Sequence, residues 1–191
     1  HYSTITTWAE FDTWLAAINA AALTAIDTET TSLHAMQAQL IGISLCVQAG
    51  HAAYIPLGHE GADAPEQLPL QAVLDKLRPW LEDASKPKLG QHIKYDSHVF
   101  ANHGLTIRGY QHDTMLQSYV LEAHKPHSLE SLALRHLGRS GASYESICGK
   151  GAQQIPFAQV AIEQASTYAC EDADFCLQVH QQLWPQLAAN P

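Results

Sequence analysis

Three short apolar segments in the first third of the chain constrain its fold most strongly. Residues 22–27 (ALTAID) form a predicted buried strand that ends in a carboxylate, and residues 39–48 (QLIGISLCVQ) alternate apolar and polar side chains as a second strand. Gly50 follows as a turn residue, and residues 52–56 (AAYIP) make a third strand. Connections this short predict an antiparallel meander, because parallel neighbours need a long crossover.

Predicted helices surround these strands. Apolar residues recur at helical spacing from residue 9 to residue 20, and Ser128 is placed to cap a later helix. Residues 138–156 are rich in glycine and polar groups, so a mobile connection with one short helical turn is expected there. No repeat or linker divides residues 1–191, and the pattern predicts a single α/β domain around a mixed sheet. The predicted helices span residues 9–20, 65–83, 96–103, 113–122, 128–137 and 160–187, and a brief strand spans residues 88–90.

The composition is that of a globular protein. Apolar residues make up 46% and charged residues 15% of the 191 residues, and no run approaches the ~18 apolar residues of a membrane span. The chain opens without a secretory signal and its four scattered cysteines form no CxxC pair, so a cytoplasmic protein with reduced thiols is expected. Twelve histidines without an HxH or HExxH pattern favour surface histidines over a histidine metal site. Because the chain opens on His1 rather than Met, we expect a fragment of a longer protein.

The net charge of −9 is unusual for a protein that binds phosphate groups directly. An acidic chain still suits a nuclease if clustered carboxylates hold divalent cations that meet the phosphate. It also suits a domain that takes its grip on nucleic acid from neighbouring domains. The net charge therefore does not separate a metal-dependent nuclease from a domain that relies on its neighbours to bind nucleic acid, and the sequence motifs are needed to distinguish them.

Asp27 and Glu29 lie two residues apart where an apolar strand ends. Side chains alternate across a strand, so these two carboxylates are expected to project from the same face. Their mutual repulsion is costly unless a cation lies between them, and hard oxygen ligands suit Mg²⁺ or Mn²⁺. The alternative is that Asp27 caps the next segment and Glu29 is solvated.

Two further segments carry carboxylates at positions that suit the same site. Tyr168 and Asp172 lie four apart in the closing helix and therefore on one face, although a routine hydrogen bond explains such a pair equally well. Asp96 and Asp113 each precede a predicted helix, where N-capping is the common role of aspartate, and local chemistry does not separate them. Together, three separated segments that each offer a carboxylate predict a two-metal phosphodiester site.

Three motifs in this sequence resemble those of the DEDD exonucleases: DTET at residues 27–30, QHIKYD at 91–96 and YACED at 168–172. A tyrosine four residues before the last aspartate is typical of the tyrosine subgroup. The resemblance extends to the proofreading 3′→5′ exonuclease domain of bacterial DNA polymerase I and spans nearly the whole chain in order. The additional matching segments are AAYIPLGH at 52–59, DTMLQSYVL at 113–121, SLESLA at 128–133 and GKG at 149–151.

The resemblance implies a ribonuclease H-like fold, with a mixed central β-sheet flanked by α-helices, and a two-metal mechanism with two divalent cations, Mg²⁺ or Mn²⁺. Asp27, Glu29 and Asp172 would hold the first cation. Asp27 would also bind the second, with Asp96 helping through water, and the resemblance favours Asp96 over Asp113. Tyr168 would hydrogen-bond the attacking water without ionising. The reaction would release nucleoside 5′-monophosphates from a DNA 3′ end.

By the same resemblance, several side chains would hold a frayed 3′ end. Leu33 matches a leucine that wedges between the last bases, and Tyr144 matches an aromatic residue that stacks on the terminal base, a contact worth roughly 1–3 kcal/mol. Ordinary packing is the alternative for both. The sequence departs from the family at His92, where asparagine is usual, and at Pro126, where a phosphate-contacting arginine is expected, so an altered grip on the strand is predicted. The remaining predicted substrate contacts are Thr28, Gln91, His92 and Tyr95.

Two other functions share parts of this pattern. An RNA-processing exonuclease of the ribonuclease D kind has the same catalytic set, although the segments GKG and DTMLQSYVL favour the polymerase type. A non-catalytic module that supports a polymerase is the second alternative, and the complete carboxylate set favours an active enzyme. We therefore expect a single-stranded DNA 3′ end as substrate, a polymerase domain in the same full-length chain, no membrane partner, and a bacterial cytoplasmic location with a nucleoid-associated function.

Overall fold

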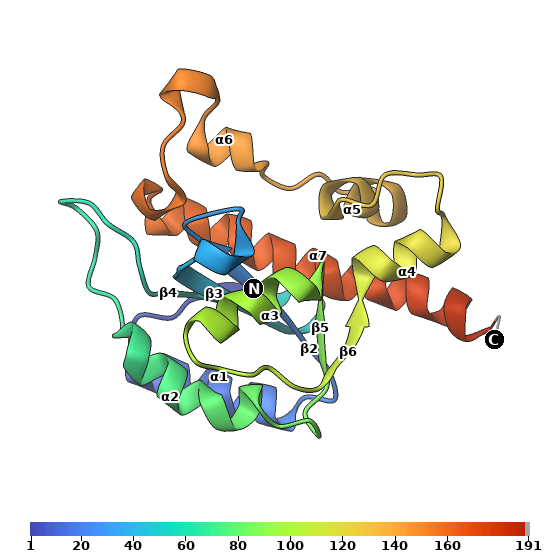
Figure 1. Cartoon of the computed structure of the whole chain (residues 1–191), viewed down its shortest axis with the longest axis horizontal. Helices are drawn as coiled ribbons and strands as arrows, with labels where there is room; N and C mark the ends of the chain where they lie inside the picture. The colour runs from blue at the N-terminus through green and yellow to red at the C-terminus, as the bar shows by residue number, and fades with distance from the viewer. Residues whose placement is uncertain (190–191) are drawn as a thin grey trace.

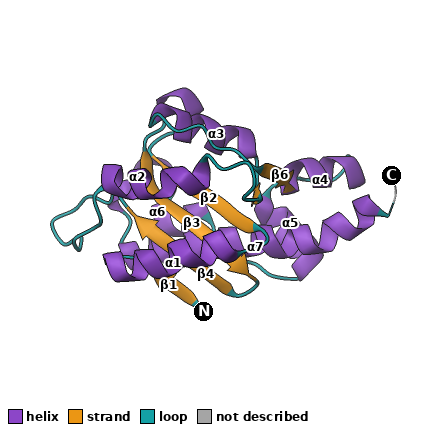
Figure 2. Ribbon diagram, turned by 90° about the horizontal axis from the view of Figure 1, so that it is seen from below, coloured by secondary structure: helices purple, strands orange, loops and turns teal. Residues whose placement is uncertain are grey.

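A six-stranded mixed sheet forms the centre of the computed structural model, which describes residues 1–189 (Figures 1 and 2). Its strands are β1 (Tyr2–Thr4), β2 (Thr24–Thr30), β3 (Leu40–Gln48), β4 (His51–Pro56), β5 (Lys88–Gly90) and β6 (Tyr110–Asp113). Their order across the sheet is β1-β4-β3-β2-β5-β6. The pairs β2–β3 and β3–β4 are antiparallel, which confirms the predicted meander, whereas β1–β4, β2–β5 and β5–β6 are parallel.

Helices cover both faces of this sheet. The α-helices of the described chain are α1 (Trp8–Ala20), α2 (Leu70–Leu81), α3 (Ile93–Asn102), α4 (Thr114–Leu121), α5 (Leu129–Leu137), α6 (Tyr144–Cys148) and α7 (Ile162–Ala188). Three short 3-10 turns in the same described residues are η1 (Ala35–Gln37), η2 (Gly151–Gln153) and η3 (Phe157–Gln159). Figure 1 shows α1 and α2 along one side of the sheet, and α7 with α4, α5 and α6 on the other. The predicted α/β fold class with a mixed sheet is confirmed.

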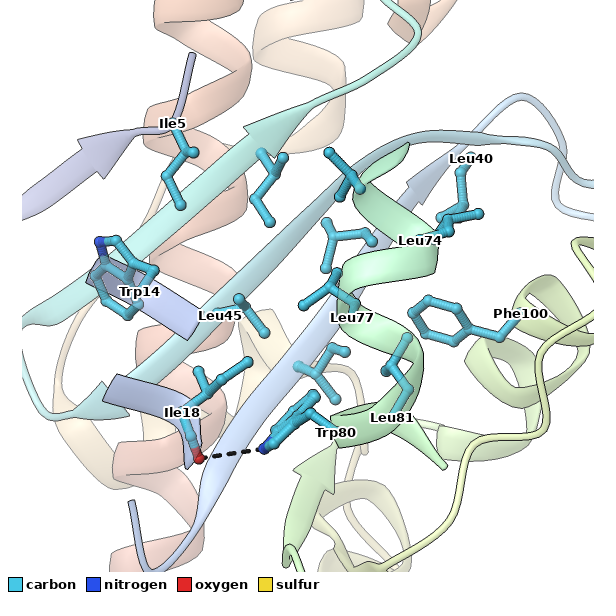
Figure 3. Close-up of a cluster of buried hydrophobic side chains, with 14 of the residues drawn as sticks. Ile5, Trp14, Ile18, Leu40, Leu45, Leu74, Leu77, Trp80, Leu81 and Phe100 are labelled. Carbon is cyan, nitrogen blue, oxygen red and sulfur yellow. Dashed lines mark hydrogen bonds between the residues drawn. The ribbon is translucent and has the colours of Figure 1, made fainter. Parts of the chain in front are cut away.

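Alternation along the strands divides the core into two layers. Ile43 and Leu45 of β3 pack with α1 and α2, whereas Tyr54 of β4 packs with α7. In the first layer the Trp80 indole N–H donates to the Ile18 carbonyl oxygen over 3.1 Å, so this buried polar group is satisfied (Figure 3). The long α7 packs on the opposite face of the sheet, against β2, β3 and β4.

Several predicted boundaries differ from the observed ones. The strand predicted at residues 22–27 runs as β2 to Thr30, so both of its carboxylates lie on the strand rather than at its end. The helix predicted from residue 65 starts at Leu70, directly after Pro69, whose ring fixes an extended approach. The Ser128 cap is confirmed, because its hydroxyl accepts from the Ser131 amide over 3.1 Å. The stretch 138–156 contains the short helix α6, as predicted, and also the 3-10 turn η2, which was not predicted.

Two strands escaped prediction from the sequence. β1 has three residues and β6 reads YQHD, so neither shows the apolar alternation that identifies a strand. Each lies at an edge of the sheet and pairs parallel with a strand far away in sequence. Their pairing partners, rather than local propensity, define them as strands.

No helix in residues 1–189 is long and apolar enough to cross a membrane. All four cysteines are buried free thiols, in agreement with the expected reduced state. The interpretation of the histidines as surface residues is wrong for His59 and His180, which are buried. Each finds a polar partner inside the fold: the Tyr54 hydroxyl at 2.7 Å from His59 Nε2, and the Gln117 amide at 2.9 Å from His180 Nδ1.

Acid is expected to weaken the fold at His180. Burial, and then the charge of nearby His112, lower the pKa of His180 to about 4, compared with about 6.5 in an unfolded chain. The neutral ring therefore contributes stability above pH ~6.5 that is lost as the pH falls through about 4. We expect His180→Gln to lose less stability than wild type between pH 7.5 and pH 4.5, measured by urea unfolding. The exposed His34→Gln serves as control, and an equal acid loss in His180→Gln and wild type would contradict the assignment.

Candidate metal centre and substrate cavity

Three carboxylates from two elements meet at one point of the sheet. β2 presents Asp27 and Glu29 on the same face, as the period of a strand requires, and α7 crosses that face with Asp172. One oxygen from each of the three lies within 4.8 Å of the others. Spacing in the sequence predicted the pair Asp27 and Glu29 and the pair Tyr168 and Asp172. The packing of α7 on β2 brings the two pairs together.

The backbone of β2 and β3 is irregular beside this cluster. Glu29 pairs with Gly42, and the register shifts at the next position through a β-bulge. Bulges of this kind redirect side chains and are frequent next to functional sites. Gly42 also leaves room for the ring of Tyr54, because a Cβ there would lie 2.1 Å from the Tyr54 hydroxyl. The missing side chain at Gly42 thus leaves room for a buried tyrosine ring beside the strand partner of Glu29.

The fourth predicted ligand, Asp96, lies in the first turn of α3 and is almost fully buried. Its Oδ1 accepts a hydrogen bond from the Thr28 hydroxyl over 2.5 Å, whereas its Oδ2 has no protein partner. A buried carboxylate oxygen without a partner is costly and is commonly explained by an ion or water. Thr28, predicted as a substrate contact, therefore orients Asp96 in this structure, and its contact with substrate stays a prediction.

Burial and mutual repulsion make these four carboxylates hard to ionise together. Burial raises the pKa of Asp27 to about 6. Burial first, and then the charge of Asp27, raise the pKa values of Glu29, Asp96 and Asp172 well above the ordinary range. None of the ion pairs between described residues includes any of the four. A divalent cation would supply positive charge here, and the oxygen-only donor set fits Mg²⁺ or Mn²⁺.

Tyr168 lies one turn before Asp172 on α7, half-buried beside the carboxylates. Burial, and then the neighbouring charges of Asp172 and Glu29, hold the pKa of its phenol far above the usual value. The phenol therefore stays protonated at physiological pH and is available as a neutral hydrogen-bonding group.

A cavity of about 830 Å³ opens above the carboxylates. Asp27, Glu29, Asp172 and Tyr168 lie on its wall, together with Leu33 and Tyr144. Leu33 is 96% exposed, so core packing, the alternative considered for it, does not explain this residue. Tyr144 and Tyr168 form an edge-to-face pair with ring centroids 6.4 Å apart. The cavity is thus lined by carboxylates and by apolar and aromatic side chains.

Comparison with known proteins assigns the family. A family model described as a 3′-5′ exonuclease matches residues 2–188. The chain belongs to the 3′-5′ exonuclease family. This exonuclease chain is 51% identical over its whole length to DNA polymerase I of Pseudomonas aeruginosa, and 38% identical over 98% of its length to DNA polymerase I of Rhizobium leguminosarum. It spans only 21% and 20% of those two relatives.

Solved structures show the same fold at low sequence identity. The POL domain of Pol1 from M. smegmatis, in complex with DNA primer-template and dNTP, matches 99% of the exonuclease chain with a TM-score of 0.73 and 20% identity, over 28% of that structure's chain. Escherichia coli RNase D matches 99% of it with a TM-score of 0.68 and 21% identity, over 46% of the RNase D chain. The implied ribonuclease H-like fold, a mixed sheet flanked by helices, is confirmed.

The exonuclease structure separates the predicted substrate contacts into two groups. Tyr95, like Leu33 and Tyr144, lines the cavity, and its hydroxyl donates to the Ser32 carbonyl over 2.5 Å, which ties α3 to the loop that carries Leu33. Gln91 and His92 do not line it. The Gln91 amide donates to the His127 carbonyl over 2.8 Å. Roles for both in substrate binding stay predictions.

One aromatic residue of the cavity was not foreseen from the sequence. Phe157, in η3, is buried in the wall, with its ring centroid 6.1 Å from that of Tyr168 and 6.3 Å from that of Tyr144. It extends the aromatic wall between two residues that were predicted. No periodicity marks it, because η3 is a three-residue turn, so the sequence held no signal for its position.

Proposed function

We propose that this chain removes nucleoside 5′-monophosphates from the 3′ ends of single-stranded or frayed DNA, with two divalent cations, Mg²⁺ or Mn²⁺. The observation that carries the proposal is the cluster of Asp27, Glu29 and Asp172, whose oxygens lie within 4.8 Å of one another without a basic partner, beside Tyr168. Membership of the 3′-5′ exonuclease family supports the reaction class.

The carboxylates would divide between two cation positions. Asp27, Glu29 and Asp172 would hold the first, and Asp27 would share the second with Asp96, whose Oδ2 has no protein partner. Bound there, the cations would lower the pKa of water and neutralise charge on the phosphodiester. Brucella melitensis NrnC, which has the same fold with a TM-score of 0.63 and 19% identity, was solved with bound Mg²⁺.

The remaining groups position the reacting atoms. The neutral Tyr168 phenol would orient the attacking water by a hydrogen bond. Attack on the terminal phosphorus breaks its bond to the 3′ oxygen of the preceding nucleotide, which leaves as a 3′-hydroxyl. Tyr144 and Phe157 offer aromatic faces for the terminal base, and the exposed Leu33 would separate it from its neighbour.

The biological setting follows from the relatives. Identity of 51% to a DNA polymerase I supports DNA rather than RNA as substrate, and a polymerase domain within the same full-length protein as partner. Proofreading in the bacterial cytoplasm, near the nucleoid, is the role that fits. The net charge of −9 is then reconciled, because cations and a neighbouring domain would meet the phosphates.

The test uses a single-stranded DNA labelled on its 3′-terminal nucleotide, with an RNA strand of the same sequence beside it. We expect Mg²⁺-dependent release of labelled mononucleotide from DNA, lost in Asp27→Ala and Glu29→Ala and kept in the exposed control Asp75→Ala. Strong preference for RNA would support a ribonuclease D-like enzyme instead. Absence of both activity and divalent-ion binding in wild type would support a non-catalytic module.

Tyr168→Phe isolates the contribution of the phenol. Loss of one hydrogen bond worth about 1–3 kcal/mol to the attacking water predicts a kcat lower by roughly 10- to 100-fold. KM and the Mg²⁺ requirement are expected to change little, because the carboxylates are intact. Steady-state kinetics on a single-stranded oligonucleotide measure this, and a kcat equal to that of wild type would exclude the role.

A further inference from the structure

The turn between β5 and α3 has an uncommon backbone. His92 has φ of 58° and ψ of 55°, and it is the only non-glycine residue with positive φ in the described part of the chain. Left-handed geometry is unfavourable for a residue with a Cβ, so surrounding contacts must hold it. The turn sets the direction in which α3 leaves the sheet, and α3 carries Tyr95 and Asp96 in its first turn.

One carboxylate supplies those contacts. Asp113, the last residue of β6, is buried, and its Oδ2 accepts from the Ile93 amide over 3.0 Å. Its Oδ1 accepts from the His92 amide over 3.0 Å and from the Met115 amide over 2.9 Å. The same side chain therefore caps α4 and binds the first amides of α3, where helix dipoles favour negative charge.

The neighbours of Asp113 reinforce the connection. β5 and β6 are paired at Gly90 and Asp113, and the Thr114 hydroxyl donates to the Gln91 side-chain carbonyl over 2.5 Å. Both residues that precede α3 are thus bound to the β6–α4 junction. Nothing else in the described chain hydrogen-bonds the amides of His92 and Ile93.

We propose that Asp113 is a positioning residue for the exonuclease reaction: by holding the left-handed turn at His92, it places Asp96 against Asp27 and orients α3 for the substrate. The inference rests on the proposed metal centre. Asp113 is assigned to the turn rather than to the cations, because its two oxygens accept three backbone amides and it lies outside the cluster of Asp27, Glu29 and Asp172. A cap for α4 alone needs only the bond to Met115, so the two bonds to α3 require another explanation.

Two substitutions of Asp113 separate its hydrogen bond to α4 from its hydrogen bonds to the start of α3. Asp113→Ser keeps a short oxygen that caps α4 but does not reach α3, whereas Asp113→Asn keeps one carbonyl oxygen for His92 and Met115 and loses only the bond to Ile93. We expect faster amide exchange at His92 and Ile93, and weaker Mn²⁺ binding by electron paramagnetic resonance, in the order wild type, Asn, Ser. Direct hydrogen-bond partners of metal ligands typically contribute 10- to 100-fold, and Asp113 acts one residue further from the ligand. Mn²⁺ affinity and kcat in Asp113→Ser should therefore fall by about 10-fold.

Asp83→Ser is the matched control, because Asp83 also accepts a backbone amide, that of Ser85, in a turn that does not lead into the site. It should lower thermal stability without changing Mn²⁺ affinity. Folded Asp113→Ser with wild-type Mn²⁺ affinity and kcat would overturn the proposal. If that variant does not fold, Asp113→Asn decides by the same measurements. Failure of wild type to bind Mn²⁺ would instead refute the proposed metal centre, and the amide exchange would still test the turn.

Discussion

Asp27→Asn is expected to abolish exonuclease activity and, in the absence of metal, to make the protein more stable at pH 7. Activity should fall by more than about 100-fold, because partners of metal ligands already contribute 10- to 100-fold and Asp27 is proposed as a direct ligand to both cations. Burial, and then the charge of Asp27, raise the pKa values of Glu29, Asp96 and Asp172, and the neutral asparagine removes the second of these causes.

The raised pKa of Asp27 predicts in which direction the stability of Asp27→Asn differs from that of wild type, and over which pH range. Burial raises the pKa of Asp27 to about 6, above the value of about 3.9 in an unfolded chain. The stability linked to its proton is complete below pH ~3.9 and is lost as the pH rises through about 6. Above that pH, the asparagine variant should therefore be more stable than wild type by about 1–3 kcal/mol.

Urea unfolding in EDTA at pH 5 and pH 7.5 measures the difference, with Asp75→Asn as an exposed control. Saturating Mg²⁺ should reverse the order, because it stabilises only the protein that binds it. An asparagine variant that is less stable than wild type in EDTA at pH 7.5 would contradict the account of the site as four unpaired, repelling carboxylates.

Gly42→Ala is expected to destabilise the fold by about 3 kcal/mol or more. The added Cβ would lie 2.1 Å from the hydroxyl and 2.3 Å from two ring carbons of Tyr54. That ring is fully buried and its hydroxyl lies 2.7 Å from His59 Nε2, so it has little room to move. For a chain of this length the melting temperature should fall by roughly 6–12 °C. Activity should fall as well, because Gly42 pairs with Glu29.

Thermal unfolding tests this, and a compensating change identifies the cause. Tyr54→Leu removes the atoms that clash, so the double variant should be more stable than the two single losses predict. Gly50→Ala is the control: it meets no atom within 4 Å and carries only the cost of a positive φ, about 1–2 kcal/mol. Equal losses in Gly42→Ala and Gly50→Ala would exclude the steric explanation.

Local periodicity was sufficient for much of this protein. The meander of β2, β3 and β4 followed from short apolar runs and short connections, and the period of a strand placed Asp27 and Glu29 on one face. The period of a helix did the same for Tyr168 and Asp172. Such patterns depend on neighbours within a few residues, so the chain itself contains them. The family resemblance added Asp96, Leu33 and Tyr144.

Only the tertiary structure decided the rest, because the deciding contacts join residues far apart in sequence. Asp96 and Asp113 look alike locally, yet amides of His92 and Ile93 occupy Asp113, while Asp96 keeps an oxygen without a protein partner. The strand β6 exists through its pairing with β5, and Phe157 reaches the cavity through the packing of η3. Side-chain periodicity thus determined which carboxylates share a face, and long-range packing determined which of them meet and remain available.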